Sequence, residues 1–132
     1  MTLKAHLRTV LKSNEYLATK LGERIYSGRF PKDPISPYLM IIETKMHPEH
    51  HMRGPESTKK IDVQISAMSA NSDENGEITQ AIIDTLDGYS GTSSGITIKT
   101  CLAFDCYDDT WSDDVGLHRR VVEFEILLTS TK

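Results

Sequence analysis

The chain has 132 residues, of which 38% are hydrophobic and 26% charged, enough for a single domain with one core and ordinary for a folded protein. Its longest apolar stretch, residues 39–42, is too short to span a membrane, and the first eight residues alternate polar and apolar side chains, unlike a secretory signal. A net charge of −4 argues against sequence-independent binding of duplex DNA, which needs a basic surface. We expect a protein of the cytoplasm, with Cys101 and Cys106 as buried or half-buried free thiols.

The charge is divided unevenly along the chain. Residues 1–60 carry 11 Lys and Arg against 6 Asp and Glu, whereas residues 61–132 carry 4 against 13. Two oppositely charged halves in one domain suit contacts with further copies of the chain or with other partners.

The N-terminal part predicts helices followed by irregular backbone. Four apolar residues repeat at helical spacing: Leu3, Leu7, Val10 and Leu11. A second short helix can follow over residues 15–21, with Gly22 as its C-cap. Residues 24–26 predict a short extended piece, and residues 30–37 hold three prolines that exclude regular structure.

The centre of the chain predicts two strands joined by a long arm. Residues 38–46 have a nearly continuous apolar centre, typical of a strand. Residues 47–59 contain Pro, Gly and charges of both signs, and predict a long loop or hairpin arm. Residues 60–70 alternate as a half-solvated antiparallel strand does. Its apolar face consists of Ile61, Val63, Ile65 and Ala67.

The C-terminal half predicts a helix and two more strands. An apolar stripe marks the helix: Ile78, Ala81, Ile82 and Leu86. Either Ser72 or Asn75 can cap it. Residues 95–107 predict a strand whose inward side chains are Ile96, Ile98, Leu102 and Phe104. Residues 105–116 predict an acidic loop, and residues 117–129 predict the last strand, with an inner face of Val122, Phe124, Ile126 and Leu128.

These elements predict one α+β domain over residues 1–132. It contains an antiparallel sheet of about four strands, with two amphipathic helices packed on one face. The segment from His47 to His51 includes His50 and invites a metal, but Pro48 excludes the helical His–x–x–x–His spacing of zinc enzymes. Residues 91–95 match G-x-S-x-G, yet a helix precedes them and a strand follows, the reverse of a nucleophile elbow. We therefore expect no enzyme and no cofactor.

The ordered features of the whole chain resemble the tail completion proteins of long-tailed bacteriophages and prophages, also called tail terminator or tail-to-head joining proteins. The resemblance rests on an N-terminal amphipathic helix and, in order, on Gly22-Glu23-Arg24-Ile25-Tyr26, the proline-rich segment 30–37, Pro37-Tyr38, His50-His51-Met52-Arg53-Gly54-Pro55, Val63-Gln64-Ile65, Leu86-Asp87-Gly88-Tyr89-Ser90-Gly91, Gly95-Ile96-Thr97-Ile98 and Gly116-Leu117-His118-Arg119-Arg120.

The resemblance implies a structural virion protein that is made in the host cytoplasm and forms a ring, usually a hexamer. Such a ring caps the tail tube, meets the head connector or stopper protein, and lets double-stranded DNA pass without sequence-specific binding. No membrane partner and no catalytic residue is implied. The alternatives are another neck ring such as a head-closure protein, a small metal enzyme using His47, His50 and His51, and a peptide-binding module with an exposed sheet edge.

Three groups of residues are candidates for contacts in such a ring. Trp111 and its acidic neighbours are expected to dock on a partner ring; the acidic residues are Asp108, Asp109, Asp113 and Asp114. Arg53, Lys59 and Lys60 are expected to face an acidic surface of a neighbour, through an arm that becomes ordered on assembly. The carboxylates expected to line the channel are those of Asp62, Glu123 and Glu125.

Overall fold

The computed structural model describes residues 3–27, 37–48, 57–93, 95–109 and 118–130. The described residues form three helices and six strands. In chain order these are α1 (Leu3–Lys12), α2 (Glu15–Leu21), β1 (Ile25–Ser27), β2 (Tyr38–Pro48), β3 (Ser57–Ser69), α3 (Ser72–Leu86), β4 (Gly91–Ser93), β5 (Ile96–Asp109) and β6 (His118–Ser130). None of the helices in these ranges is long and apolar enough to cross a membrane.

The strands form one mixed sheet in the order β1-β2-β3-β6-β5-β4. The four long strands β2, β3, β6 and β5 are antiparallel neighbours, as the sequence predicts. The prediction of about four strands is corrected by two short ones, because β1 pairs parallel with β2 and β4 pairs antiparallel with β5. β1 overlaps the short extended piece predicted over residues 24–26, whereas β4, with only three residues, is too short for an alternating pattern to be visible in the sequence.

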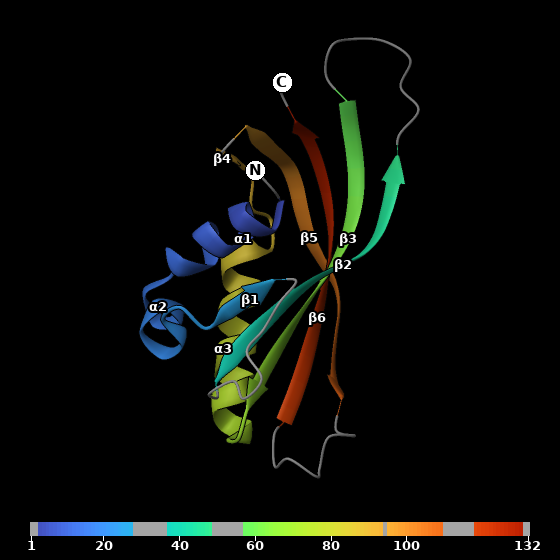
Figure 1. Cartoon of the computed structure of the whole chain (residues 1–132). Helices are drawn as coiled ribbons and strands as arrows, with labels where there is room; N and C mark the ends of the chain where they lie inside the picture. Colours follow the sequence, from blue (N-terminus) through green and yellow to red (C-terminus); the bar gives the residue numbers. More distant parts are fainter. Residues whose placement is uncertain (1–2, 28–36, 49–56, 94, 110–117, 131–132) are drawn as a thin grey trace.

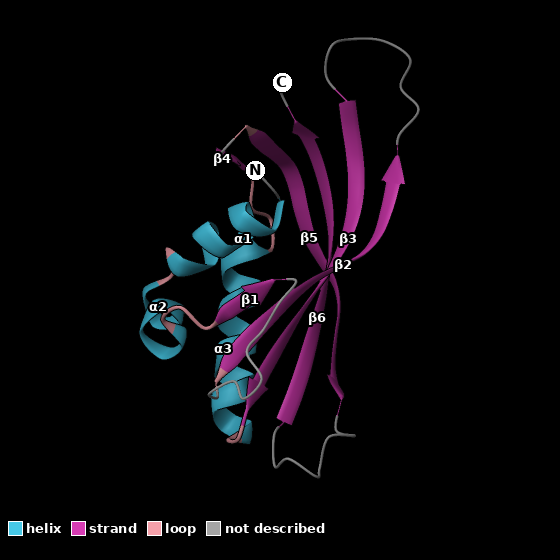
Figure 2. Ribbon diagram, in the orientation of Figure 1, coloured by secondary structure: helices cyan, strands magenta, loops and turns pink. Residues whose placement is uncertain are grey.

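All three helices lie on one face of the strongly twisted sheet (Figures 1 and 2). The core fills the space between them and includes apolar side chains from the helices, β2, β3, β5 and β6. Phe124 in the middle of β6 is fully buried, as are Leu7 of α1 and Ile82 of α3. The inner faces predicted for β3 and β6 are therefore confirmed.

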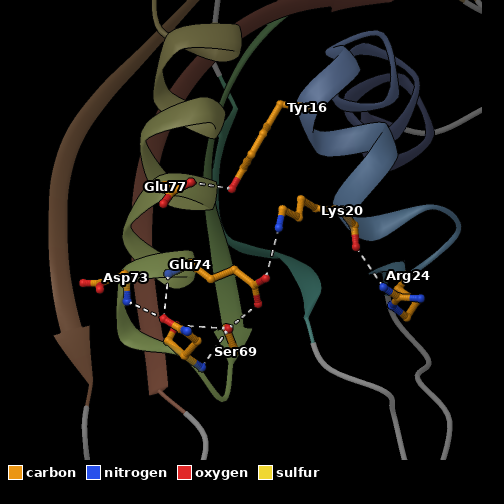
Figure 3. A network of polar contacts seen from close by, with 8 residues as sticks. Tyr16, Lys20, Arg24, Ser69, Asp73, Glu74 and Glu77 are labelled. Atoms are coloured by element: carbon orange, nitrogen blue, oxygen red, sulfur yellow. Dashed lines mark hydrogen bonds and ion pairs between the residues drawn. The ribbon is translucent and has the colours of Figure 1, made fainter.

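Polar contacts fix α2 against α3 (Figure 3). The Tyr16 hydroxyl donates to Glu77 Oε2 at 3.2 Å, and Lys20 Nζ lies 3.4 Å from Glu74 Oε2. Asn14 accepts a hydrogen bond from the Leu17 N–H as the N-cap of α2, and its own Nδ2 donates to Thr85 Oγ1. The predicted C-cap Gly22 is confirmed, since its N–H donates to the Ala18 carbonyl at 2.9 Å, so the short second helix has a cap at both ends and α3 along its side.

The start of α3 differs from both predicted alternatives, because Asn71 is its N-cap. The Asn71 side chain accepts hydrogen bonds from the N–H groups of Asp73 and Glu74. Asn75 is buried inside the first turns, where its Nδ2 donates to the carbonyls of Ala67 at 3.1 Å and His118 at 2.6 Å. One amide group thereby ties α3 to both β3 and β6.

The end of α3 reaches the edge of β5. Asp87 is the C-cap, and Gly88 follows with a φ of 80°, in the left-handed region that glycine tolerates best. The Gly88 N–H donates to the carbonyl of Cys101 at 2.7 Å, and Asp87 Oδ1 accepts from the N–H of Ala103 at 3.0 Å. The helix end therefore covers part of β5 where none of the described strands is paired to it on that side.

Two bulges change the inward side chains of β5 from those predicted. Ile96 and Ile98 are buried as expected, but Leu102 is 52% and Phe104 is 54% exposed, and Cys101 takes the inward position. The register with β6 shifts between Ile98 and Thr100 and again between Ala103 and Asp105. An extra residue at a bulge moves the following side chains to the opposite face, which a strict alternation cannot anticipate.

Candidate functional site

The face of the sheet turned away from the helices carries a group of carboxylates. Since Ile61 and Val63 point inward, Asp62 between them points to the helix-free face. Asp62 lies directly opposite Glu125 of β6, and Gln64 lies opposite Glu123. The structure thus brings together the three residues predicted to line a channel, and we call Asp62, Glu123 and Glu125 the acidic face.

Neutralisation of the acidic face within the chain is partial. Lys60 Nζ lies 3.5 Å from Glu125 Oε1, with both side chains more than a third exposed, so water screens this pair strongly. The Tyr107 hydroxyl donates to Glu123 Oε1 at 3.3 Å and accepts from Gln64 Nε2 at 3.1 Å. Lys60, predicted to meet an acidic neighbour, thus has a carboxylate partner in its own chain.

Asp105 extends the acidic face onto β5. It lies directly opposite Glu123, and like charges at directly opposed positions are unfavourable. Asp105 Oδ1 accepts the N–H of Cys106 at 2.9 Å, but no ion pair joins Asp105 to another residue in the described ranges. The sheet face therefore keeps an excess of negative charge around Glu123.

The same face is closed and less acidic toward Ser69. There Arg119 donates from Nε and Nη2 to Ser66 Oγ, at 3.3 and 3.2 Å. Tyr38, Met68 and Val121 are buried although they belong to the helix-free side of the sheet. Among the carboxylates of this face whose exposure the structure describes, the accessible ones thus lie in the middle of the strands.

The predicted acidic loop begins later than expected, because β5 continues to Asp109. Asp108 faces Arg120 across the strands, with 3.4 Å between Arg120 Nε and Asp108 Oδ1, and Asp109 is paired with Arg119 in the backbone register. The side chain of Asp108 is still 64% exposed. The docking candidates Trp111, Asp113 and Asp114 lie outside the described residues.

The predicted arm is shorter than expected at both ends. Residues 47–48 continue β2 and residues 57–59 begin β3, with His47 paired to Lys60 and Pro48 to Lys59. Arg53 lies outside the described residues, as do His50 and His51 of the proposed metal site. Within the described ranges, no three His, Cys, Asp or Glu side chains are grouped as metal ligands.

The two cysteines occupy different environments. Cys101 is fully buried, and burial raises the pKa of its thiol to about 12, with a smaller contribution from the charge of Asp87. Cys106 is exposed, which corrects the expectation that both thiols are at least half-buried. Both are free, as predicted.

Comparison with known proteins agrees with the resemblance in the sequence. Residues 5–129 match the family described as tail completion protein gp17. A chain of the virion of a native gene transfer agent particle has a similar fold, with a TM-score of 0.80 and 17% identity over 97% of this chain and 95% of that one. No curated protein matches the sequence. The chain belongs to the tail completion protein gp17 family, and it is a structural protein of a phage-type tail.

Proposed function

We propose that the chain forms a closed ring, a hexamer when assembled, at the head-proximal end of the tail. The ring ends the tail tube by binding the tail tube protein, and it joins the tube to the head connector or stopper protein. Assembly takes place in the host cytoplasm. Membership in the tail completion family supports this placement. The proposal of a channel lining is supported by one observation, the group of carboxylates on the sheet face that no described helix covers.

The acidic face is proposed to line the passage for double-stranded DNA. Duplex DNA carries about one negative charge per 1.7 Å of its axis, so a basic lining would hold it and a carboxylate lining repels it. Asp62, Glu123 and Glu125 repeated around a ring would give such a lining. The repulsion is nonspecific, in keeping with passage of DNA of any sequence.

Charge reversal tests the channel lining. Glu123→Lys together with Glu125→Lys should leave folding intact, because both side chains are only partly buried, and should slow DNA exit from the particles. Asp84→Lys on the exposed side of α3 is the matched control, with the same change of charge per residue on the helical layer. Normal DNA exit from the double variant, with slowed exit from the control, would place the helices at the channel instead.

The segment around Trp111 is proposed to dock on the partner ring. Tryptophan is enriched at binding hot spots, and the nearby carboxylates of Asp108, Asp109, Asp113 and Asp114 would meet Lys and Arg there. The basic candidates for contacts with a neighbouring copy are Arg53, Lys59 and Lys60, although Lys60 already forms an ion pair with Glu125.

Replacing Trp111 with Ala tests the docking. We expect a stable protein and reduced joining of heads to tails, measured as the yield of joined particles. Joining at the wild-type yield, together with slower DNA exit after Asp-to-Lys changes at Asp113 and Asp114, would assign this segment to the channel.

The number of copies that can be cross-linked to one another in assembled tails tests the ring itself. Chemical cross-linking of the tails should give linked products up to six copies. Monomers alone, or dimers with like surfaces facing each other, would exclude a ring built from head-to-tail contacts.

A further inference from the structure

The two outer long strands of the sheet, β2 and β5, have edges that the short strands β1 and β4 cover only in part. On β5, β4 covers only Ile96–Ile98, and the end of α3 covers Cys101 and Ala103. For residues 104–109, no described strand pairs with the outer edge. An unpaired edge presents backbone N–H and C=O groups that another strand can bind.

The opposite end of the sheet has a second open edge. β1 pairs with β2 only at Leu39, Met40 and Ile41. Beyond that point, residues 42–48 of β2 have β3 on one side and no described strand on the other. A bulge between Glu43 and Lys45 lies in this open part.

Exposed apolar side chains are concentrated on these two strands. Four large hydrophobic residues of the described chain are exposed, by 38–54%: Ile42, Leu102, Phe104 and Tyr107. The first belongs to β2 and the other three to β5, while the helices, β3 and β6 contribute none among the described residues. Three of the four, Ile42, Phe104 and Tyr107, belong to the open parts of the two edges, and such a concentration of exposed apolar groups marks a surface that becomes covered in an assembly.

The charges beside the two edges are opposite. Lys45 on β2 and Asp105 on β5 both point to the helix-free side, since they lie opposite Asp62 and Glu123. No ion pair joins Lys45 to another residue of the described ranges, and the same holds for Asp105. One edge therefore offers a cation and the other an anion, each without a charged partner among the described residues.

Strand direction also favours pairing between the two edges. The four long strands alternate in direction across the sheet, so β2 and β5 are antiparallel to each other. When two copies stand side by side in the same orientation around a ring axis, β5 of one copy and β2 of the next are again antiparallel. The alternation then continues from copy to copy.

We propose that the open edge of β5, residues 104–109, pairs with the open edge of β2, residues 42–48, in the next copy of this chain. This contact between β5 of one copy and β2 of the next is the seam of the ring. It joins the sheets of all copies into one continuous sheet, with Lys45 facing the neighbour's acidic β5 edge. The inference rests on the proposed ring and adds the surfaces that form it.

A two-fold pairing of β5 with β5 is the competing arrangement, and the charges oppose it. It would bring the acidic residues of this edge, Asp105 and Asp108, close to those of the partner copy, and like charges on paired strands are destabilising. It would also leave the β2 edge with its exposed Ile42 unpaired. Only the β5-to-β2 contact uses both edges, and such a contact between unlike surfaces can close into a ring.

The exposed Cys106 provides a direct test, because it lies within the proposed β5 edge. Single cysteines are introduced along the β2 edge as Ile42→Cys, Glu43→Cys, Thr44→Cys and Lys45→Cys. Paired antiparallel strands bring Cα atoms to about 4.5–5.5 Å, within the reach of a disulfide. After mild oxidation of assembled tails, at least one of these variants should give a ladder of linked copies that disappears on reduction.

Two controls define the result. Thr19→Cys adds an exposed thiol on α2 and should give no ladder, and adding Cys106→Ser to a positive variant should abolish it. A wild-type dimer linked through Cys106 would overturn the proposal in favour of two-fold pairing. Oligomers of normal mass without a ladder from any of the four positions would contradict the pairing of β5 with β2 but not the formation of a ring. Tails in which the chain is monomeric by mass would overturn the proposed function itself.

Charge exchange at the seam gives a second test that needs no disulfide. Lys45→Asp and Asp105→Lys should each lower the yield of rings severalfold, because each places like charges at the seam. The double variant should recover most of the yield, since it restores opposite charges. A double variant whose loss equals the two single losses combined would contradict pairing between these edges.

Discussion

The two faces of the sheet are built by the same strands, yet they differ in how completely side chains of the same chain bury them. On the helix-covered face, Val63 and Phe124 are buried by side chains from the helices. On the helix-free face, the neighbouring residues Asp62 and Glu123 remain partly exposed, and Glu123 faces a further carboxylate on Asp105. The covered face therefore stabilises the fold, whereas the helix-free face and its edges are available for contacts outside the chain.

The largest effect separating the two faces is expected at adjacent residues of β6. Phe124→Ala should lower the free energy of unfolding by about 4 kcal/mol, because it leaves a cavity in the core. Glu123→Ala should change it by less than about 0.5 kcal/mol, because its side chain lies on the helix-free face. Urea unfolding of both variants measures the difference. Similar losses in the two would mean that the helix-free face is also closed within the chain.

The two thiols of β5 differ in burial, and their reactivities should differ accordingly. At pH 8, Cys101 should react with a thiol reagent about a thousandfold more slowly than a thiol of ordinary pKa near 8.5, because its pKa of about 12 leaves little thiolate. Exposed Cys106 should react promptly. Mass spectrometry should therefore show one label on the folded chain and two after unfolding. Prompt labelling of both thiols in the folded chain would show that β5 is open on its inner face.

A polar residue on the covered side sharpens the comparison further. Asn75→Ala should cost about 2 kcal/mol of unfolding free energy, because the carbonyls of Ala67 and His118 lose their common donor. Gln80→Ala, on the exposed side of the same helix, is the matched control and should be nearly neutral. Equal effects would show that the Asn75 contacts do not hold α3 to the sheet.

The smallest effect is expected from His6, which α1 buries against Tyr89. His6 Nε2 lies 2.9 Å from the Tyr89 hydroxyl, and burial lowers the pKa of His6, opposed in part by the backbone of Ile96. The unfolded chain binds this proton near pH 6.5, so the unfolding free energy should fall as the pH drops below 6.5 toward the lowered pKa.

The pH dependence can be assigned with one variant. His6→Gln keeps a polar side chain near Tyr89 but removes the titration, so stability between about pH 6.5 and 5 should depend less on pH than in the wild type. An unchanged slope in this range would mean that His6 is not the group responsible.

The sequence predicts the covered face much better than the edges. Alternation places Ile61, Val63 and Ile65 inward, and the structure agrees, because one buried face leaves a regular pattern of period two. Leu102 and Phe104 follow the same pattern and are nevertheless exposed, since bulges in β5 depend on its pairing with β6 and have no local signature here.

The candidate site was predictable in its residues but not in its partners. Asp62, Glu123 and Glu125 were identified as solvent-facing from alternation alone, while their meeting on one face depends on β3 and β6 being neighbours. The contact of Lys60 with Glu125 joins residues far apart in the sequence, and so does that of Arg120 with Asp108. The sequence indicates Asn75 only as a possible cap, because a buried bridge from one amide to two strands leaves no pattern in the sequence.

The helix-free face of the sheet is proposed to line the DNA channel of a ring. The most direct measurement places a photoreactive amino acid at position 123 and, in a second variant, at position 77 on α3, in particles whose DNA is crossing the neck. We expect protein–DNA adducts from position 123 and none from position 77. Adducts from position 77 alone would show that the helices, and not the helix-free face of the sheet, face the DNA.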